Sequence, residues 1–198
     1  ALDQGTTSSR TLIVDNEGTI IAIEQEEFEQ IFPNSGWVEH DPKAILKSQL
    51  NTLHKVLTSS KIAVEDIAGI GITNQRETTV IWNKNTGEPI YNAIVWQDKR
   101  TANICEELKR KNLATHIKKT TGLVIESYFS ATKIHWILNN VPNAKKQSDS
   151  VTQKMKTQNR LGDTAFDVLL GNLSDPPKKK KQKIALSKKR ENKTCFIL

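Results

Sequence analysis

The spacing of apolar residues near the start of the chain predicts a small antiparallel sheet. Apolar and polar side chains alternate over residues 19–28, after an apolar segment at residues 11–15 and a turn at residues 16–18. The apolar pair at residues 1–2 adds a short strand beside this hairpin. The polar residues 3–10 therefore form a loop at one end of a small meander.

A helix is expected after this sheet. Asp41 is a suitable N-cap residue, and Pro42 suits the first helical position. Leucines then follow at positions i, i+4, i+7 and i+11, which places them on one face of the helix. This face consists of Leu46, Leu50, Leu53 and Leu57.

The middle of the chain predicts further strands. Residues 67–73 are apolar and rich in isoleucine, as expected for a short strand that is buried on both faces. Residues 78–82 and 90–96 are expected to pair with each other across the turn at residues 83–89. Open α/β sheets bind ligands beyond the ends of their strands, so the polar residues that follow these segments are candidate site residues.

Three helices are expected next. Asp98 is expected to cap the first, which runs to about residue 111 with Cys105 in the core. The second and third cover residues 114–119 and 130–139. The histidines and cysteines lack the spacing of a metal site, and no disulfide framework is expected.

The net charge of +7 is concentrated near the end of the chain. Residues 178–198 contain nine of the 29 basic residues but one of the 22 acidic residues, so the remainder is almost neutral. The basic excess is thus a property of this tail, and no nucleic-acid partner is expected. No apolar run reaches the roughly 18 residues of a membrane span, so we expect a cytoplasmic protein.

The loop at residues 3–10 has the composition of a phosphate-binding turn. Gly5 permits close approach of the backbone, and the hydroxyl groups that follow it donate hydrogen bonds without bulk. A carboxylate at the end of the first strand is placed to hold a hydrated Mg²⁺. The alternative is an ordinary polar turn with a surface arginine. The candidate nucleotide-binding residues are Asp3, Thr6, Thr7, Ser8 and Arg10, with Asp3 also the candidate magnesium ligand.

Four other side chains have the chemistry of a polyol-binding site. Arg76 can donate to hydroxyl oxygens, and the neighbouring Glu77 can accept from hydroxyl hydrogens. Trp96 can cover a carbon backbone, and Tyr128 adds a polar tip to an apolar wall. The alternatives are a surface ion pair for the first two residues and core packing for the two aromatic residues.

Several runs of residues resemble the N-terminal part of the FGGY carbohydrate kinases and, within that family, the glycerol kinases. These runs are residues 1–10, 36–42, 71–79, 91–97, 121–124 and 128–130, and the resemblance continues to about residue 145. It implies an α/β fold, the N-terminal part of the ribonuclease-H-like ATPase domain shared with actin and hexokinases. It also implies ATP-dependent phosphorylation of glycerol to glycerol 3-phosphate, with ATP and Mg²⁺ as cofactors and a homo-oligomeric full-length enzyme.

The resemblance implies a role for each candidate residue. Asp3 would position the metal, and the nucleotide phosphates would meet Thr6, Thr7, Ser8 and Arg10. Glycerol would be bound by Arg76, Glu77, Trp96 and Tyr128. Family members place the general base and the adenine site in a second domain, which nothing after residue 145 resembles. No catalytic residue is therefore assigned, and little turnover is expected from this chain alone.

The last part of the chain admits different interpretations. Residues 1–145 are expected to form part of a kinase domain, residues 146–177 a linker of unknown origin and residues 178–198 a disordered basic tail. Cys195 begins a sequence that fits a prenylation signal, and the lysines before it would supply a second membrane signal. The alternatives are that the segment arises from a frameshift, an aberrant splice, a gene-model error or a fusion, or that the tail binds nucleic acid. A non-catalytic ATPase-fold fragment and a membrane-tethered module stay open as functions.

Overall fold

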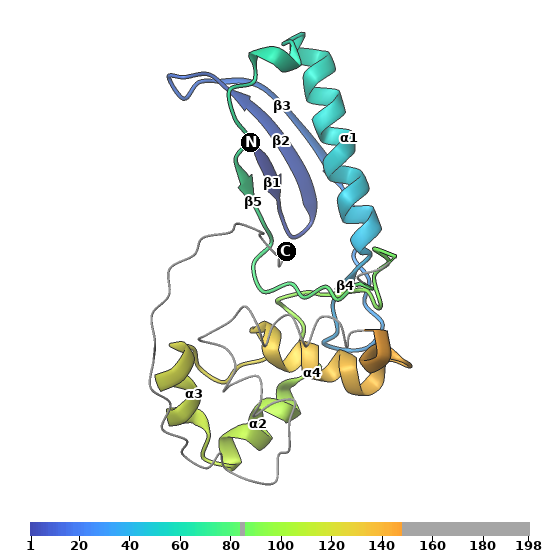
Figure 1. Ribbon diagram of the computed structural model, residues 1–198, viewed down its shortest axis with the longest axis vertical. Coiled ribbons are helices and arrows are strands. Elements are labelled where there is room, and N and C mark those ends of the chain that lie inside the picture. Colours follow the sequence, from blue (N-terminus) through green and yellow to red (C-terminus); the bar gives the residue numbers. More distant parts are fainter. Residues whose placement is uncertain (84–85, 148–198) are drawn as a thin grey trace, which may run out of the picture.

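Figure 1 shows the computed structural model, which describes residues 1–83 and 86–147. One part of the molecule is a small β-sheet with a long helix, α1, lying beside it, and the other part contains helices α2, α3 and α4. The predictions for the linker after residue 147, for the basic tail and for Cys195 lie outside the described residues.

Within the described residues, the main sheet has four strands in the order β3, β2, β1, β5. The first three strands form the predicted antiparallel meander, and β5 adds parallel to β1. The Asp15 carboxylate holds the turn between β2 and β3 by accepting hydrogen bonds from the backbone nitrogens of Glu17 and Thr19. The strands are β1 (Leu2–Gln4), β2 (Ser8–Val14), β3 (Ile20–Glu27) and β5 (Ile72–Thr73).

Helix α1 (Pro42–Ser60) begins as predicted but buries a different face. The Asp41 side chain caps its first turn, accepting a hydrogen bond from the backbone nitrogen of Lys43 at 2.8 Å. The predicted leucine face is only partly covered, because Leu46 is 61% exposed and Leu50 is 46% exposed, whereas Leu53 and Leu57 are half-buried. The buried residues of this helix are Ile45, Ser48, Thr52 and Val56.

Hydroxyl groups explain the orientation of α1. Ser48 Oγ lies 2.7 Å from Ser9 Oγ, and Thr52 Oγ1 lies 2.8 Å from Thr11 Oγ1, so short polar side chains of α1 pair with those of β2. Each buried hydroxyl thus has a partner, which removes the cost of burying it. Leu46 and Leu50, by contrast, are exposed.

The predicted buried strand at residues 67–73 is wrong in both length and burial. The strand covers Ile72–Thr73, after a 3-10 turn at Val64–Asp66, and both of its residues are exposed. The side chain of Ile70 is also exposed. The reason is position: β5 lies at the edge of the described sheet, whereas α1 packs mainly on β2 and β3.

A short strand pair joins distant segments beside the main sheet. Strand β4 (Glu39–His40) pairs antiparallel with β6 (Ala93–Ile94), a contact that the sequence analysis did not predict. The two segments that were expected to pair as regular strands instead meet in isolated bridges, such as Thr79 with Ile94. The pairing was therefore predicted correctly, but its regularity was not.

The remaining helices lie close to their predicted positions. Cys105 and Leu108 of α2 pack with Ile117 of α3 and with Ile125, and Cys105 is confirmed as a core residue at 3% exposed. None of the described helices is both long enough and apolar enough to cross a membrane. The helices are α2 (Ala102–Arg110), α3 (Ala114–Thr121) and α4 (Ser130–Asn140).

The prediction that Asp98 caps α2 is wrong, since the N-cap residue is Thr101. The Asp98 carboxylate instead accepts hydrogen bonds from the backbone nitrogen of Val38 at 2.7 Å and from the Arg100 guanidinium at 2.8 Å. The Arg100 side chain is fully buried and also contacts Glu39 at 2.8 Å. A buried cation is costly unless it is paired with anions, so pairing with Arg100 stabilises the fold more than a helix cap at Asp98 would.

Aromatic rings complete the surroundings of Arg100. Its guanidinium carbon lies 3.9 Å from the centroid of a Trp37 ring and 4.7 Å from that of Trp136. Charge pairing and cation–π contact together compensate for its burial. The group thereby holds together β4, the segment after β6 and helix α4.

We predict that Arg100→Leu lowers the free energy of unfolding by about 3–5 kcal/mol, because two buried carboxylates lose their cation. Urea denaturation measures this loss. The matched control is Arg110→Leu at the exposed end of α2, which should change stability by less than about 0.5 kcal/mol. Equal effects of the two substitutions would contradict this account of the fold.

His40 makes the stability depend on pH. The residue is fully buried, and its burial lowers the pKa from 6.5 to about 4, because the imidazolium is disfavoured away from water. Its Nε2 lies 2.6 Å from Gln30 Oε1. In the unfolded chain His40 binds a proton near pH 6.5, so this residue contributes to stability at neutral pH and loses that contribution as the pH falls toward 4.

We therefore predict a loss of about 3 kcal/mol from this residue between pH 7 and pH 4. Urea denaturation at several pH values should show a shallower decline for His40→Gln than for the wild type. His54→Gln, at an exposed position of α1, should keep the wild-type decline. An unchanged decline in His40→Gln would show that His40 does not contribute.

Candidate active site

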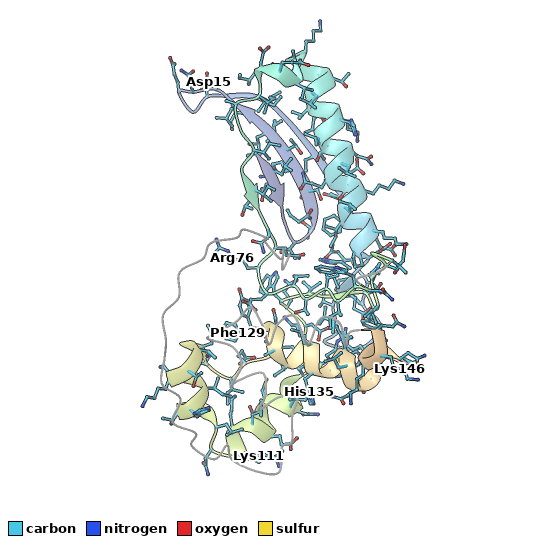
Figure 2. The ribbon with its side chains drawn as sticks, viewed as in Figure 1. Asp15, Arg76, Lys111, Phe129, His135 and Lys146 are labelled. Atoms are coloured by element: carbon cyan, nitrogen blue, oxygen red, sulfur yellow. The ribbon has the colours of Figure 1, made fainter. Side chains whose placement is uncertain are left out.

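An open cavity of about 340 Å³ lies where the sheet meets the helical part of the molecule. Four segments that are far apart in the sequence line it: the end of β1 with the turn after it, the segment that follows β5, the residue Trp96 and the residue Tyr128. Figure 2 places Arg76 at this junction, between the sheet and the helices. The lining residues are Asp3, Gln4, Gly5, Thr6, Thr73, Asn74, Gln75, Arg76, Trp96 and Tyr128.

The turn between β1 and β2 forms one wall of the cavity. The backbone nitrogen of Gly5 donates to the carbonyl of Ser8 at 3.0 Å, and a Cβ at Gly5 would meet that same oxygen at 3.0 Å. A side chain at this position would therefore push the turn open. The tight turn brings Thr6 to the cavity.

Trp96 connects this turn to the other walls. Its Nε1 donates to Thr6 Oγ1 at 3.0 Å, and its ring meets the edge of the Tyr128 ring at a centroid distance of 5.9 Å. The Thr6 hydroxyl keeps its own hydrogen for a ligand. Trp96 and Tyr128 thus pack against each other and also line the cavity, so their packing does not exclude a binding role.

Asp3 and Arg10 form an ion pair beside the turn. Arg10 Nη1 lies 3.6 Å from Asp3 Oδ2, and Arg10 Nε donates to Gln25 Oε1 at 3.1 Å. Both charged side chains are partly exposed, and the carboxylate lines the cavity whereas the guanidinium does not. The two residues face each other across the β1–β2 pairing.

Thr7 and Ser8 lie farther from the cavity than the loop prediction implies. Strand β2 begins at Ser8 rather than at Thr11, so Ser8 is a buried strand residue. Thr7 is exposed, and its carbonyl accepts a hydrogen bond from the backbone nitrogen of Phe28. Neither residue is among those that line the cavity. Their contact with phosphate stays a prediction.

Arg76 and Glu77 point to different neighbours. Arg76 is exposed and lines the cavity, whereas the Glu77 carboxylate turns to helix α4. Glu77 Oε2 accepts hydrogen bonds from the backbone nitrogen of Ser130 at 3.0 Å and from its hydroxyl at 2.9 Å. Among residues 1–83 and 86–147, no ion pair joins Arg76 to Glu77, so the alternative of a surface ion pair is not observed.

The sequence analysis missed Lys133, which is fully buried beneath this site. Its ammonium donates to the carbonyl of Glu77 at 2.8 Å and to the carbonyl of Tyr128 at 2.7 Å. Burial lowers the pKa of this lysine from 10.5 to about 8. One indication of this burial was present in the sequence: Lys133 directly precedes Ile134, which was predicted to lie on the inner face of the helix.

Asp3 is a suitable partner for Mg²⁺. No cluster of three or more histidine, cysteine, aspartate or glutamate side chains that could hold a metal ion occurs in the described part of the chain. Mg²⁺ usually keeps several waters and is held by one or two carboxylates together with substrate phosphates. One carboxylate on the cavity wall satisfies this requirement.

Comparison with known proteins agrees with this geometry. Residues 1–160 match the N-terminal domain of the FGGY family of carbohydrate kinases. The chain is 56% identical over 150 residues to a glycerol kinase of Vibrio cholerae and 57% identical over 149 residues to one of Alkaliphilus oremlandii. These matches cover 76% and 75% of this chain, but they span 30% of each relative's length.

Solved structures support the same assignment. A glycerol kinase from Plasmodium falciparum, crystallised with ADP, matches 76% of this chain with a TM-score of 0.72 and 39% identity, over 30% of its own length. A xylulose kinase from Lactobacillus acidophilus matches 74% of this chain and 29% of its own, with a TM-score of 0.66; at 24% identity it supports the fold alone. The predicted α/β fold of actin-type and hexokinase-type ATPases is confirmed, and the chain belongs to the FGGY family of carbohydrate kinases.

Proposed function

We propose that this chain forms the glycerol-binding and phosphate-binding walls of an ATP:glycerol 3-phosphotransferase. One observation carries the proposal: the hydrogen bond between Trp96 and Thr6 brings the candidate polyol wall against the candidate phosphate turn around one cavity. The high identity to glycerol kinases favours glycerol over other polyols. Because the chain spans 30% of the length of those relatives, we assign it binding and positioning.

The chemistry of the polyol wall suits a three-carbon alcohol. The Arg76 guanidinium presents several donors to hydroxyl oxygens, and the rings of Trp96 and Tyr128 cover the apolar C–H groups. The described hydrogen bonds of the Glu77 carboxylate use Oε2, so Oε1 is the oxygen that we assign to a glycerol hydroxyl. These four residues would fix one terminal hydroxyl toward the turn at Thr6.

The phosphate wall would hold the donor nucleotide. We assign the ATP phosphates to the Thr6 hydroxyl and the turn around it, with Thr7, Ser8 and Arg10 as further predicted contacts. Mg²⁺, when bound, neutralises phosphate charge, and Asp3 would hold its hydration shell. Phosphoryl transfer depends chiefly on positioning and charge stabilisation, which both walls supply. We assign no general base to the described residues.

Other assignments belong to the same proposal. A cytoplasmic location follows from the use of ATP, which is an intracellular phosphoryl donor. Homo-oligomerisation stays a prediction. The membrane-tethered alternative depends on Cys195, which lies outside the described residues. Calorimetry that shows binding of neither glycerol nor Mg-ATP would remove the alternative of a non-catalytic binding fragment.

We predict that Trp96→Ala weakens glycerol binding by at least about tenfold, because it removes both the apolar cover and the bond that positions Thr6. Isothermal titration calorimetry with glycerol measures the change. Trp82→Ala removes a partly exposed tryptophan of the Trp82–Pro89 bridge and should leave the affinity unchanged. Absence of glycerol binding by the wild type, or equal losses in both variants, would reject the proposed polyol site.

We also predict that Asp3→Asn removes the magnesium dependence of ATP binding. Wild-type affinity for ATP should fall by roughly tenfold when EDTA is added, because Asp3 contributes through the metal. In Asp3→Asn the affinity should be low with or without Mg²⁺. Asp15→Asn, at the far end of the sheet in Figure 2, should behave as the wild type. A retained magnesium response in Asp3→Asn would exclude Asp3 as the metal contact.

A further inference from the structure

Lys133 is an unusual residue for the inner face of a helix. Its side chain is fully buried on α4, among residues that pack on the core. Burying an ammonium is costly unless hydrogen bonds compensate. No carboxylate lies within ion-pair distance of Lys133 in the described part of the chain, and two backbone carbonyls receive its hydrogen bonds.

The two carbonyls belong to the two segments that carry the polyol wall. One is the carbonyl of Glu77, the residue directly after Arg76, and the other is the carbonyl of Tyr128. These segments are far apart in the sequence, and both Arg76 and Tyr128 line the cavity. The ammonium of Lys133 therefore connects the segment that carries Arg76 with the segment that carries Tyr128.

The backbone at Glu77 needs this support. Its φ of 61° lies in the left-handed region, which is unfavourable for a residue with a side chain. Such a conformation persists when surrounding contacts over-determine it. Here the carbonyl is held by Lys133, and the carboxylate is held by the backbone nitrogen and the hydroxyl of Ser130. All of these contacts come from the first turns of α4.

We propose that Lys133 is a positioning residue of the polyol site, which fixes the Arg76 guanidinium and the Tyr128 ring relative to Trp96 by holding the carbonyls of Glu77 and Tyr128. The proposal rests on the proposed function, because it assigns the positioned groups to glycerol. The charged groups around this ammonium are Glu77, Asp98, Arg100 and Lys99, and together with burial they leave its pKa at about 8. The lysine is therefore still largely protonated at neutral pH, with three hydrogens to donate.

The experiment compares Lys133→Met, which keeps an unbranched chain but removes the donors, with Ile137→Ala. Ile137 is a fully buried core residue of the same helix, and its truncation lowers stability without touching the two carbonyls. Glycerol affinity is measured by calorimetry. The position of the Trp96 indole N–H signal and of the Ser130 amide signal is measured by ¹⁵N NMR, with Trp96→Phe identifying the indole.

We expect Lys133→Met to weaken glycerol binding by at least about tenfold and to shift both NMR signals, since small displacements of binding groups are costly. Ile137→Ala should be less stable but bind glycerol within about twofold of the wild type, with both signals unmoved. Equal affinities and unmoved signals in Lys133→Met would overturn the proposal, as would an equal loss of affinity in Ile137→Ala.

A second variant covers the case in which Lys133→Met does not fold. Lys133→Gln keeps an N–H₂ donor that can reach one carbonyl but not both, so a partial loss of glycerol affinity, of about threefold to tenfold, is expected, and wild-type affinity would overturn the proposal. If the wild type itself does not bind glycerol, the proposed polyol site fails. The positioning role is then judged by the two NMR signals: shifts in Lys133→Gln support it, and wild-type positions reject it.

Discussion

The hydrogen bond from the Trp96 indole to the Thr6 hydroxyl is the contact on which the site depends. Thr6 lies in a turn of the β-sheet, and Trp96 follows strand β6 in the helical part of the molecule. Without this bond, the turn and the aromatic wall would be separate surfaces. With it, hydroxyl, guanidinium and aromatic groups line one cavity.

Buried charges connect several of the segments that surround this cavity. Arg100 connects β4 with the segment after Trp96 through Glu39 and Asp98, and its guanidinium stacks on Trp37. Lys133 connects two segments that line the cavity by donating hydrogen bonds to the carbonyls of Glu77 and Tyr128. Charged groups that are buried with partners are sensitive to displacement, because moving one partner leaves the other unpaired. Because separating these partners costs free energy, the loops that carry them are held in one geometry.

The first turns of α4 contact two of the candidate site residues, Glu77 and Tyr128. The backbone nitrogen of Ser130 donates a hydrogen bond to the Glu77 carboxylate. Lys133 donates to the carbonyl of Glu77 and to that of Tyr128, which lies just before the helix. A carboxylate at a helix N-terminus is favourable for the exposed N–H groups and for the helix dipole. Glu77, which the sequence analysis predicted to bind glycerol, therefore stabilises the start of the helix through Oε2.

Features that depend on neighbouring residues were predictable from the sequence. The turn after Asp15, the cap at Asp41 and the core position of Cys105 were predicted correctly, since each follows from local hydrogen bonds or helical spacing. The candidate residues Thr6, Arg76, Trp96 and Tyr128, which line one cavity, were proposed from their chemistry and from family resemblance, and their roles stay predictions. The family assignment could be made in the same way, because its motifs are short and contiguous.

The tertiary structure alone decided which faces are buried and which partners meet. Leucine spacing could not show that Ser48 and Thr52 would face β2, because the hydroxyl partners lie on another element. Asp98 was a plausible cap by sequence, but the buried cation of Arg100 attracts it more strongly. The role of Lys133 depends on two carbonyls that sequence cannot place. Local pattern thus determined the elements and the chemistry available, whereas long-range pairing of buried polar groups determined the site.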